Sequence, residues 1–339
     1  MRVTASAPGK LVLLGEYAVL EGAPALVLAV DRRARVTLAP SSGHWEIVSP
    51  TLQLQARLRL RDGRPSWIDA APPELEWIAT LLARFPQTER LPACRIELDS
   101  DAFYLEHEGT RQKLGLGSSA ALTVALLGAL HAHTHAAPPT IDEAIEAHRA
   151  IQQGQGSGID IAASLTGGLS RFRLDGGAAR VAPTALPITL HWVCVYSGRS
   201  ASTRAMLATV VAWREREPTA FTQYMHELAT ISSRGIDALT ANDAATFLSS
   251  LHDYATALAR FGAAAGADIA SREHQAIAAT AADCGCVYKS CGAGGGDIGV
   301  TFAVEDTRLR EFSERALRAG FPVIGLEADP KGLEVVSNI

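Results

Sequence analysis

Apolar and polar residues alternate along the chain with two different periods, which separate strand-like from helix-like stretches. Four short apolar segments lie near the N-terminus, at residues 2–7, 11–16, 25–30 and 34–39, and predict buried strands. Residues 52–60 then alternate strictly, with leucines and an alanine facing one way and glutamines and arginines facing the other. This alternation predicts a strand with one buried face.

The helical period appears at residues 72–86, where Pro73 stands at the start and apolar residues recur every three or four positions. A second helix is indicated by Thr140 and Glu143, which form a capping box, and by Gly154, which suits a helix end. Further helices are predicted at residues 201–214, 220–239, 244–261, 272–283 and 308–318.

The order of these elements is mixed, without a regular alternation of strand and helix. Residues 93–100 return to the strand pattern, and two more strand-like segments flank the glycine-rich stretch 290–302. Pro183 and Pro187 mark the best place for a boundary. We therefore expect an α+β fold with one lobe at residues 1–187 and a second at residues 188–339.

Composition excludes several classes of function. The 339 residues are 47% hydrophobic and 20% charged with a formal net charge of −5, which is typical of a protein with a sizeable core. Lysines and arginines are scattered, so nothing in the charge pattern favours a nucleic-acid or membrane partner. The first residues lack the apolar core of a signal peptide, and no apolar stretch approaches the length of a membrane span. We expect a cytoplasmic protein that is a monomer or a homodimer.

The cysteines do not suggest a disulfide framework, because only five are present and they are widely spaced. Cys284, Cys286 and Cys291 could be thiolate ligands of a metal, but no fourth donor stands at a known spacing. We therefore interpret the cysteines as buried thiols in a reducing compartment.

The segment KLGLGSSAALTVALLGAL, residues 113–130, joins a glycine–serine loop to an apolar helix. Glycines let a ligand approach the main chain, and the helix start presents unpaired N–H groups with partial positive charge. This combination suits the phosphates of a nucleotide, although a simple turn would have the same composition. The segment matches neither the Walker spacing nor the dinucleotide-binding spacing.

Together with two more segments, residues 113–130 resemble the motifs of a known family. SAPGKLVLLGEYAVLEGAPALVLAVDR near the N-terminus, KLGLGSSAALTVAL in the middle and YKSCGAGGGDIGVTF near the C-terminus resemble the three motifs of the GHMP kinases, in that family's order. The resemblance implies an N-terminal ribosomal S5 domain 2-like lobe and a C-terminal ferredoxin-like α/β sandwich lobe. It also implies ATP and Mg²⁺ as cofactors and small molecules as partners.

Within this family the local patterns look most like those of phosphomevalonate kinases. Mevalonate kinases usually have GEH in the first motif, where this chain has Tyr17, and a helix glutamate where this chain has Arg149. The resemblance implies phosphoryl transfer from ATP to mevalonate 5-phosphate. Mevalonate or another small alcohol is the alternative acceptor. A regulator without catalysis is a third interpretation, which the intact Lys10, Asp160 and GLGSS segment disfavour.

Two charged residues are the predicted catalytic pair. Asp160 follows the small-residue loop GQGSG at a loop–helix junction, where an aspartate is either a helix cap or a reacting group. The resemblance implies that Asp160 is the catalytic carboxylate and that Lys10 is its partner cation. The pair could act as a true base or by electrostatic positioning.

The resemblance also assigns the binding residues. Ser119 is the predicted Mg²⁺ contact, and Glu146 is either a second ligand or part of a solvated helix face. The predicted nucleotide-binding residues are Lys113, Gly115, Leu116, Gly117, Ser118, Ser119 and Ala120. The predicted acceptor-binding residues are Lys10, Tyr17, His148, Ser157, Gly158, Arg199, Ser200, Ser202, Thr203, Ser290, Gly292 and Ala293, with Arg204 beside them.

Overall fold

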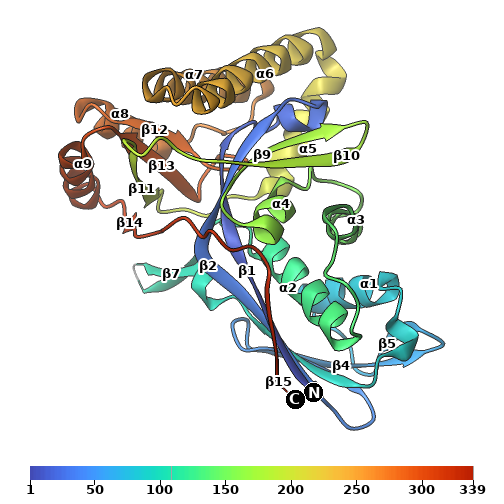
Figure 1. The fold of residues 1–339 in the computed structure, drawn as a ribbon. Coiled ribbons are helices and arrows are strands. Elements are labelled where there is room, and N and C mark those ends of the chain that lie inside the picture. The colour runs from blue at the N-terminus through green and yellow to red at the C-terminus, as the bar shows by residue number, and fades with distance from the viewer. Residues whose placement is uncertain (108, 339) are drawn as a thin grey trace.

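The computed structural model describes residues 1–107 and 109–338 and has a nine-stranded and a four-stranded sheet with helices packed on them, together with a separate two-stranded sheet of β7 and β8 (Figure 1). The strands of the N-terminal half are β1 Arg2–Leu14, β2 Ala25–Pro40, β3 Trp45–Ser49, β4 Leu54–Arg61, β5 Arg64–Trp67, β6 Cys94–Asp99, β7 Tyr104–His107, β8 Thr110–Lys113, β9 Leu169–Asp175 and β10 Ala178–Thr184. Those of the C-terminal half are β11 His191–Tyr196, β12 Val287–Ser290, β13 Ile298–Ala303, β14 Val323–Ile324 and β15 Glu334–Asn338.

The helices largely follow the predicted ranges. They are α1 Glu76–Arg84, α2 Ser118–His133, α3 Ile141–Ile151, α4 Ile159–Thr166, α5 Thr203–Arg216, α6 Pro218–Thr240, α7 Ala244–Ala265, α8 Arg272–Asp283 and α9 Asp306–Arg318. Short 3₁₀ turns lie at Ala18–Glu21, Pro73–Leu75, Thr88–Arg90 and Asp101–Phe103. The predicted cap of α3 is confirmed, since the Thr140 side chain accepts a hydrogen bond from the Glu143 N–H.

The larger sheet is built on two long antiparallel strands. β1 pairs along β2 from Val3 to Leu14, with an irregularity at Pro8–Gly9, and the nine-stranded sheet continues in the order β10-β9-β2-β6-β3-β4-β5. The four short strands expected near the N-terminus are therefore two continuous ones. The alternation in residues 52–60 is confirmed from Leu54 onward, whereas Leu52 lies in a turn and is 40% exposed.

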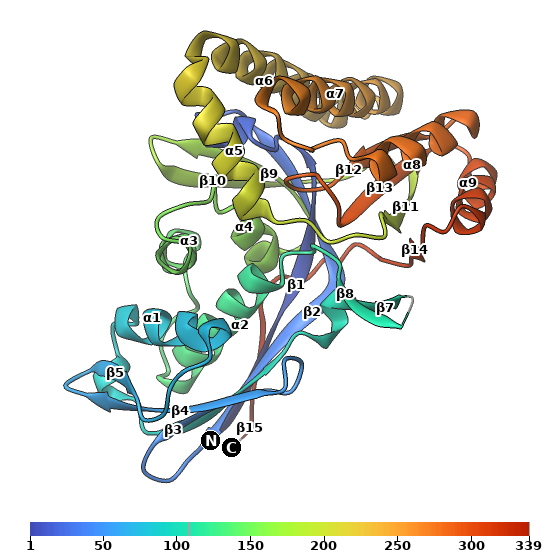
Figure 2. The same ribbon diagram turned by 180° about the vertical axis from the view of Figure 1, so that it is seen from behind.

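One face of this sheet carries α1 to α4, as Figure 2 shows from behind. α2 packs against both β1 and β2, and α4 packs against β1 and α2. α2 has buried residues all around its axis, which explains its apolar sequence. Because α2 and α4 are anchored on the same strands, their N-terminal ends lie next to Lys10 of β1.

The smaller, four-stranded sheet has the order β12-β13-β11-β14, and all its pairings are antiparallel. α8 packs against β12, and α9 packs against β11 and β13. The antiparallel helices α6 and α7 lie at the top of Figure 1, with α7 in contact with both β12 and β1. The mixed α+β class is confirmed, with an α/β layer in the C-terminal half.

The C-terminal segment returns to the first lobe. β15 pairs with the start of β1, so the two chain ends lie close together in Figure 1. Arg33 of β2 holds the segment by donating to Asp329 Oδ2 at 2.5 Å and to the Gly332 carbonyl at 2.7 Å. β10 of the larger sheet ends at Thr184 and β11 of the smaller sheet begins at His191, on either side of the proposed boundary near residue 187. Ala328 and β15 nevertheless pair with strands of the larger sheet, and the division into two lobes stays a proposal. Among the described residues, no helix combines the length and apolar character needed to cross a bilayer.

Candidate active site

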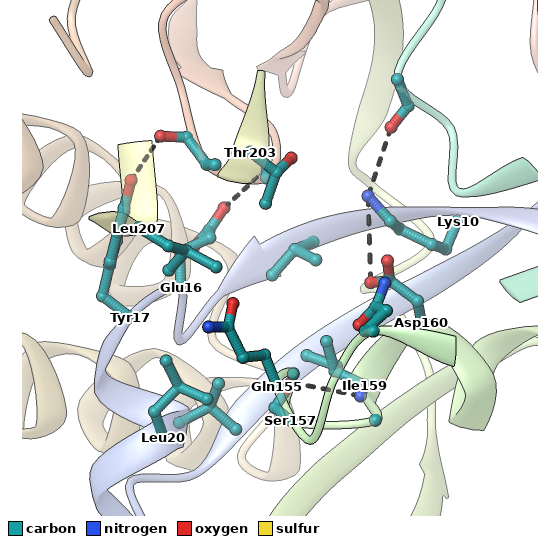
Figure 3. A pocket seen from close by; sticks show the side chains of 18 of the residues that line it. Lys10, Glu16, Tyr17, Leu20, Gln155, Ser157, Ile159, Asp160, Thr203 and Leu207 are labelled. Atoms are coloured by element: carbon teal, nitrogen blue, oxygen red, sulfur yellow. Dashed lines mark hydrogen bonds and ion pairs between the residues drawn. The ribbon is translucent and has the colours of Figure 1, made fainter. Parts of the chain in front are cut away.

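A cavity of about 370 Å³ lies where three segments from distant parts of the chain meet (Figure 3). They are the first loop, which follows β1 and holds Glu16 and Tyr17, the loop 155–158 before α4, and the third loop, the glycine-rich residues 291–296 after β12. Lys10 and Asp160 face each other on one side of it, and Glu16 and Tyr17 lie on the opposite side. The predicted residues that line it are Lys10, Tyr17, Gly115, His148, Ser157, Gly158, Asp160, Thr203, Arg204, Gly292 and Ala293. The three sequence motifs therefore contribute to one site.

The two residues of the predicted catalytic pair lie close together. Lys10 Nζ lies 3.9 Å from Asp160 Oδ1 and donates a hydrogen bond to the Gly115 carbonyl at 3.3 Å. Lys10 is 6% exposed, and a buried ammonium group requires such partners. Gly158 is the N-cap of α4, so Asp160 lies in the first helical turn rather than at the cap. Its carboxylate is thus left free to face the cavity.

The loop before α2 can approach an anion closely. Gly117 caps α2 in the left-handed conformation, and no side chain occupies the cap position. The first N–H groups of α2 are therefore available to a ligand and carry partial positive charge. A side chain at Gly117 would also meet Lys10, since an added Cβ would lie 3.1 Å from Lys10 Cε. Glycine is favoured here for both reasons.

His148 connects the start of α2 to α3. Its Nε2 lies 3.3 Å from Ser119 Oγ and 3.4 Å from Gln152 Nε2. Burial lowers the pKa of His148, and the nearby Asp160 charge only partly opposes this shift. The imidazole is therefore neutral near pH 7, and it adds hydrogen-bonding capacity to the cavity wall without adding charge.

The described residues contain no group of three or more His, Cys, Asp or Glu that could hold a metal ion. A cation at this site would have to take most of its ligands from nucleotide phosphates, which is how Mg²⁺ commonly binds. Ser119 is compatible with that arrangement because it is exposed to solvent at the start of α2. Glu146 is exposed on α3, as expected for a solvated face.

The glycine-rich third loop is held from both lobes. Tyr17 donates its hydroxyl hydrogen to the Ala293 carbonyl at 2.6 Å. Asp297 Oδ1 accepts from the Ala201 N–H at 3.1 Å, and its own N–H donates to the Arg199 carbonyl at 2.7 Å. Burial raises the pKa of Asp297. These contacts give the loop one defined shape beside the cavity.

Other predicted residues lie outside the cavity lining. Arg199 forms ion pairs with Asp268 and Glu273, each at 3.5 Å. Ser202 caps α5 by accepting from the Ala205 N–H. The remaining residues outside the lining are Lys113, Leu116, Gly117, Ser118, Ser119, Ala120, Ser200 and Ser290. Those from Leu116 to Ala120 form the loop and the first turn of α2, whereas Arg199 and Ser202 are occupied elsewhere, and their contact with an acceptor stays a prediction.

Sequence reasoning missed several lining residues. Glu16 and the glutamines Gln152 and Gln155 contribute polar groups, and Leu20 and Leu207 contribute apolar ones. Glu16 adjoins Tyr17 in the first motif, so its position was a usable signal. The glutamines carry no comparable signal, because amides at the end of a helix are common on solvated surfaces.

A family match and the fold indicate the class of protein. The family model described as the GHMP kinases N terminal domain matches residues 77–168. A solved structure of Streptococcus pneumoniae phosphomevalonate kinase, in complex with phosphomevalonate and AMPPNP, has the same fold, with a TM-score of 0.78 at 18% identity. That similarity covers 96% of this chain and 99% of the other. Residues 77–168 therefore match the N-terminal domain of the GHMP kinases, and the chain as a whole has the fold of a phosphomevalonate kinase.

Its relatives in sequence include two kinds of kinase from one pathway. A mevalonate kinase from Methanothermobacter thermautotrophicus is 38% identical over 174 residues, and the match spans only half of each chain. A phosphomevalonate kinase from a Streptomyces species is 27% identical, over 87% of this chain and 88% of the relative. The relatives thus include kinases that act on two different acceptors, and the acceptor of this chain has to be argued from the site.

Proposed function

We propose that this protein transfers the γ-phosphoryl group of ATP to the phosphate of mevalonate 5-phosphate, which yields the 5-diphosphate and ADP. The observation that carries the proposal is the pairing of the buried Lys10 ammonium group with the partly exposed Asp160 carboxylate, 3.9 Å apart, between the N-terminal ends of α2 and α4. Two helix N-termini beside one buried ammonium group form a site suited to highly anionic reactants.

In the proposed reaction a bond forms between an acceptor phosphate oxygen and the γ-phosphorus, and the bond to the β-phosphate oxygen breaks. Lys10 would neutralise charge on the moving phosphoryl group, and Asp160 would accept any proton on the attacking oxygen. A phosphate monoester is already mostly dianionic near pH 7, because its second pKa is about 6. Positioning and charge neutralisation are therefore the larger requirements for this acceptor.

The nucleotide phosphates would lie against the Gly115–Ala120 loop and the first turn of α2. Ser119 would contact a Mg²⁺ ion bound to those phosphates, and this ion supplies charge neutralisation between the phosphoryl groups. Gly117 allows the phosphates to approach the backbone beside Lys10.

Two features favour a phosphorylated acceptor over mevalonate itself. Arg204, in the first turn of α5, lines the cavity and forms no ion pair with another described residue, so its guanidinium is available to an anionic group. Arg149 stands where mevalonate kinases have a glutamate, and it donates to the carbonyls of Gly156 and Ser157 instead. It therefore shapes the loop before Asp160 rather than binding a metal.

Mevalonate is the alternative acceptor, because the mevalonate kinases are also relatives of this chain. An assay of ADP release with mevalonate 5-phosphate, mevalonate and simple phosphorylated alcohols as acceptors distinguishes the two. We expect the highest kcat/KM with mevalonate 5-phosphate. Faster turnover of mevalonate would refute the proposal and favour the alternative, and no turnover with any acceptor would favour a binding role.

A further inference from the structure

A buried ion pair links the first loop, which follows β1, to the strand that leads into the glycine-rich third loop, residues 291–296. Lys289, on β12, donates through Nζ to Oε1 of Glu16, which follows β1. The Lys289 side chain is 1% exposed and the Glu16 side chain 4%. Because β1 belongs to the larger sheet and β12 to the smaller one, the pair connects the two lobes.

The surroundings of this pair are well defined. Lys289 also donates to the Ser290 carbonyl at 2.7 Å and lies 5.7 Å from the centre of the Tyr254 ring. Tyr254 in turn donates its hydroxyl hydrogen to the Glu16 carbonyl at 2.8 Å. Burial raises the pKa of Glu16, and the Lys289 ammonium group opposes that shift. The carboxylate therefore depends on Lys289 to remain charged in this position.

Stability alone is a weak reason for such a pair, because apolar residues of similar volume are often at least as stabilising in a core. The geometry suggests another reason. Glu16 Oε1 accepts a hydrogen bond from the Gly292 N–H at 3.3 Å, and the neighbouring Tyr17 holds the Ala293 carbonyl. Glu16 and Tyr17, which are adjacent in the first loop, thus hold the adjacent residues Gly292 and Ala293 of the third loop.

We propose that Lys289 is a positioning residue, which orients Glu16 so that the glycine-rich loop 291–296 stays in the place where it forms the acceptor wall of the cavity. Glu16, Gly292 and Ala293 line the cavity, whereas Lys289 is not among its lining residues. Lys289 therefore acts on the acceptor through Glu16 and the loop. The inference rests on the proposed function only for the identity of the acceptor.

The test compares Lys289→Met, Glu16→Gln and the double variant with the wild type. Lys289→Met should speed amide hydrogen exchange in residues 288–296 of the ligand-free protein. It should also raise KM for the acceptor at least about tenfold, the order of loss expected when one partner of a buried pair is removed. KM for ATP should change by less than about threefold, because the α2 loop is not held by this pair.

The double variant removes the uncompensated charge and leaves a glutamine oxygen that can still accept from the Gly292 N–H. Its acceptor KM and its exchange rates should therefore lie closer to the wild type than those of Lys289→Met. Arg214→Ala is the matched control, since Arg214 forms an exposed pair with Glu21 at 2.8 Å, also between the two halves of the chain. It should leave all three measurements unchanged.

The inference is overturned if Lys289→Met leaves loop exchange and acceptor KM at wild-type values, or if both KM values rise together with a lowered melting temperature. Should Lys289→Met fail to fold, Glu16→Gln tests the same contact under the same criteria. Hydrogen exchange needs no substrate. If mevalonate 5-phosphate is not phosphorylated but the loop still loosens, the proposed function fails and the positioning role stands.

Discussion

Replacing Gly117 with alanine tests whether the loop before α2 positions Lys10. Gly117 has φ 79° and ψ 36°, and placing a residue with a side chain in this left-handed region costs about 1–2 kcal/mol. The new Cβ would also lie 3.1 Å from Lys10 Cε and 3.2 Å from Lys10 Cγ. These distances are shorter than the roughly 3.5–4.0 Å optimum for carbon atoms, so either Lys10 or the loop must move.

The displacement needed is a few tenths of an ångström, and it falls on an ammonium group that Asp160 and the Gly115 carbonyl hold in place. A misplacement of about 1 Å in a catalytic site can lower the rate about 100-fold. We therefore expect Gly117→Ala to lower kcat by about tenfold or more. The free energy of unfolding should fall by about 1–2 kcal/mol, measured by urea denaturation.

Gly266→Ala separates strain from displacement of Lys10. Gly266 ends α7 with φ 70° and ψ 24°, and nothing lies within 4 Å of an added Cβ. It should lose similar stability while keeping wild-type kcat in the ADP-release assay. Equal kcat losses in the two variants, or an unchanged kcat in Gly117→Ala, would refute the reasoning about Lys10.

Three further predictions follow from the same structure. Asp160→Asn should lower kcat by about 10²- to 10⁴-fold while nucleotide affinity, measured by calorimetry, changes little; undiminished turnover would contradict the role of the carboxylate. Burial lowers the pKa values of His148 and His274 in the folded protein, so below the unfolded pKa of about 6.5 the unfolded state binds more protons and stability falls with falling pH. Urea denaturation between pH 7.5 and 5.5 (roughly one unit either side of that pKa) measures this, and His274→Gln should reduce the slope. Arg33→Met should destabilise the protein by about 2 kcal/mol and should make the C-terminal strand more accessible to proteases, because it removes the contact with Asp329; unchanged proteolysis would show that β15 is held by its strand pairing alone.

Local patterns predicted most elements because their causes are local. The alternation from Leu54 to Leu60 and the capping box at Thr140 each depend on residues a few positions apart. The strand β1 was harder to predict, since Pro8 and Gly9 look like a break. At Gly9 the strand comes close to the loop before α2, where an added Cβ would lie 2.9 Å from the Leu116 carbonyl oxygen.

The sequence predicted the candidate-site residues that lie within the family motifs. Resemblance to the GHMP kinases pointed to Lys10 and Asp160, which are 150 positions apart in sequence and 3.9 Å apart in space. It did not separate Thr203 and Arg204, which line the cavity, from Arg199, which pairs with Asp268 and Glu273. The direction of each side chain there depends on where α5 begins and on what packs beside it.

The sequence by itself determined the class of fold, the positions of most helices and strands, and three loops too rich in small residues to be regular structure. Only the tertiary structure decided which charges meet where no motif marks the pair. Glu16 and Lys289 look like ordinary surface charges in their own segments, yet they form a buried pair across 273 positions. The physical reason is that periodicity is a property of neighbouring residues, whereas the partner of a buried charge is chosen by how whole sheets and helices pack.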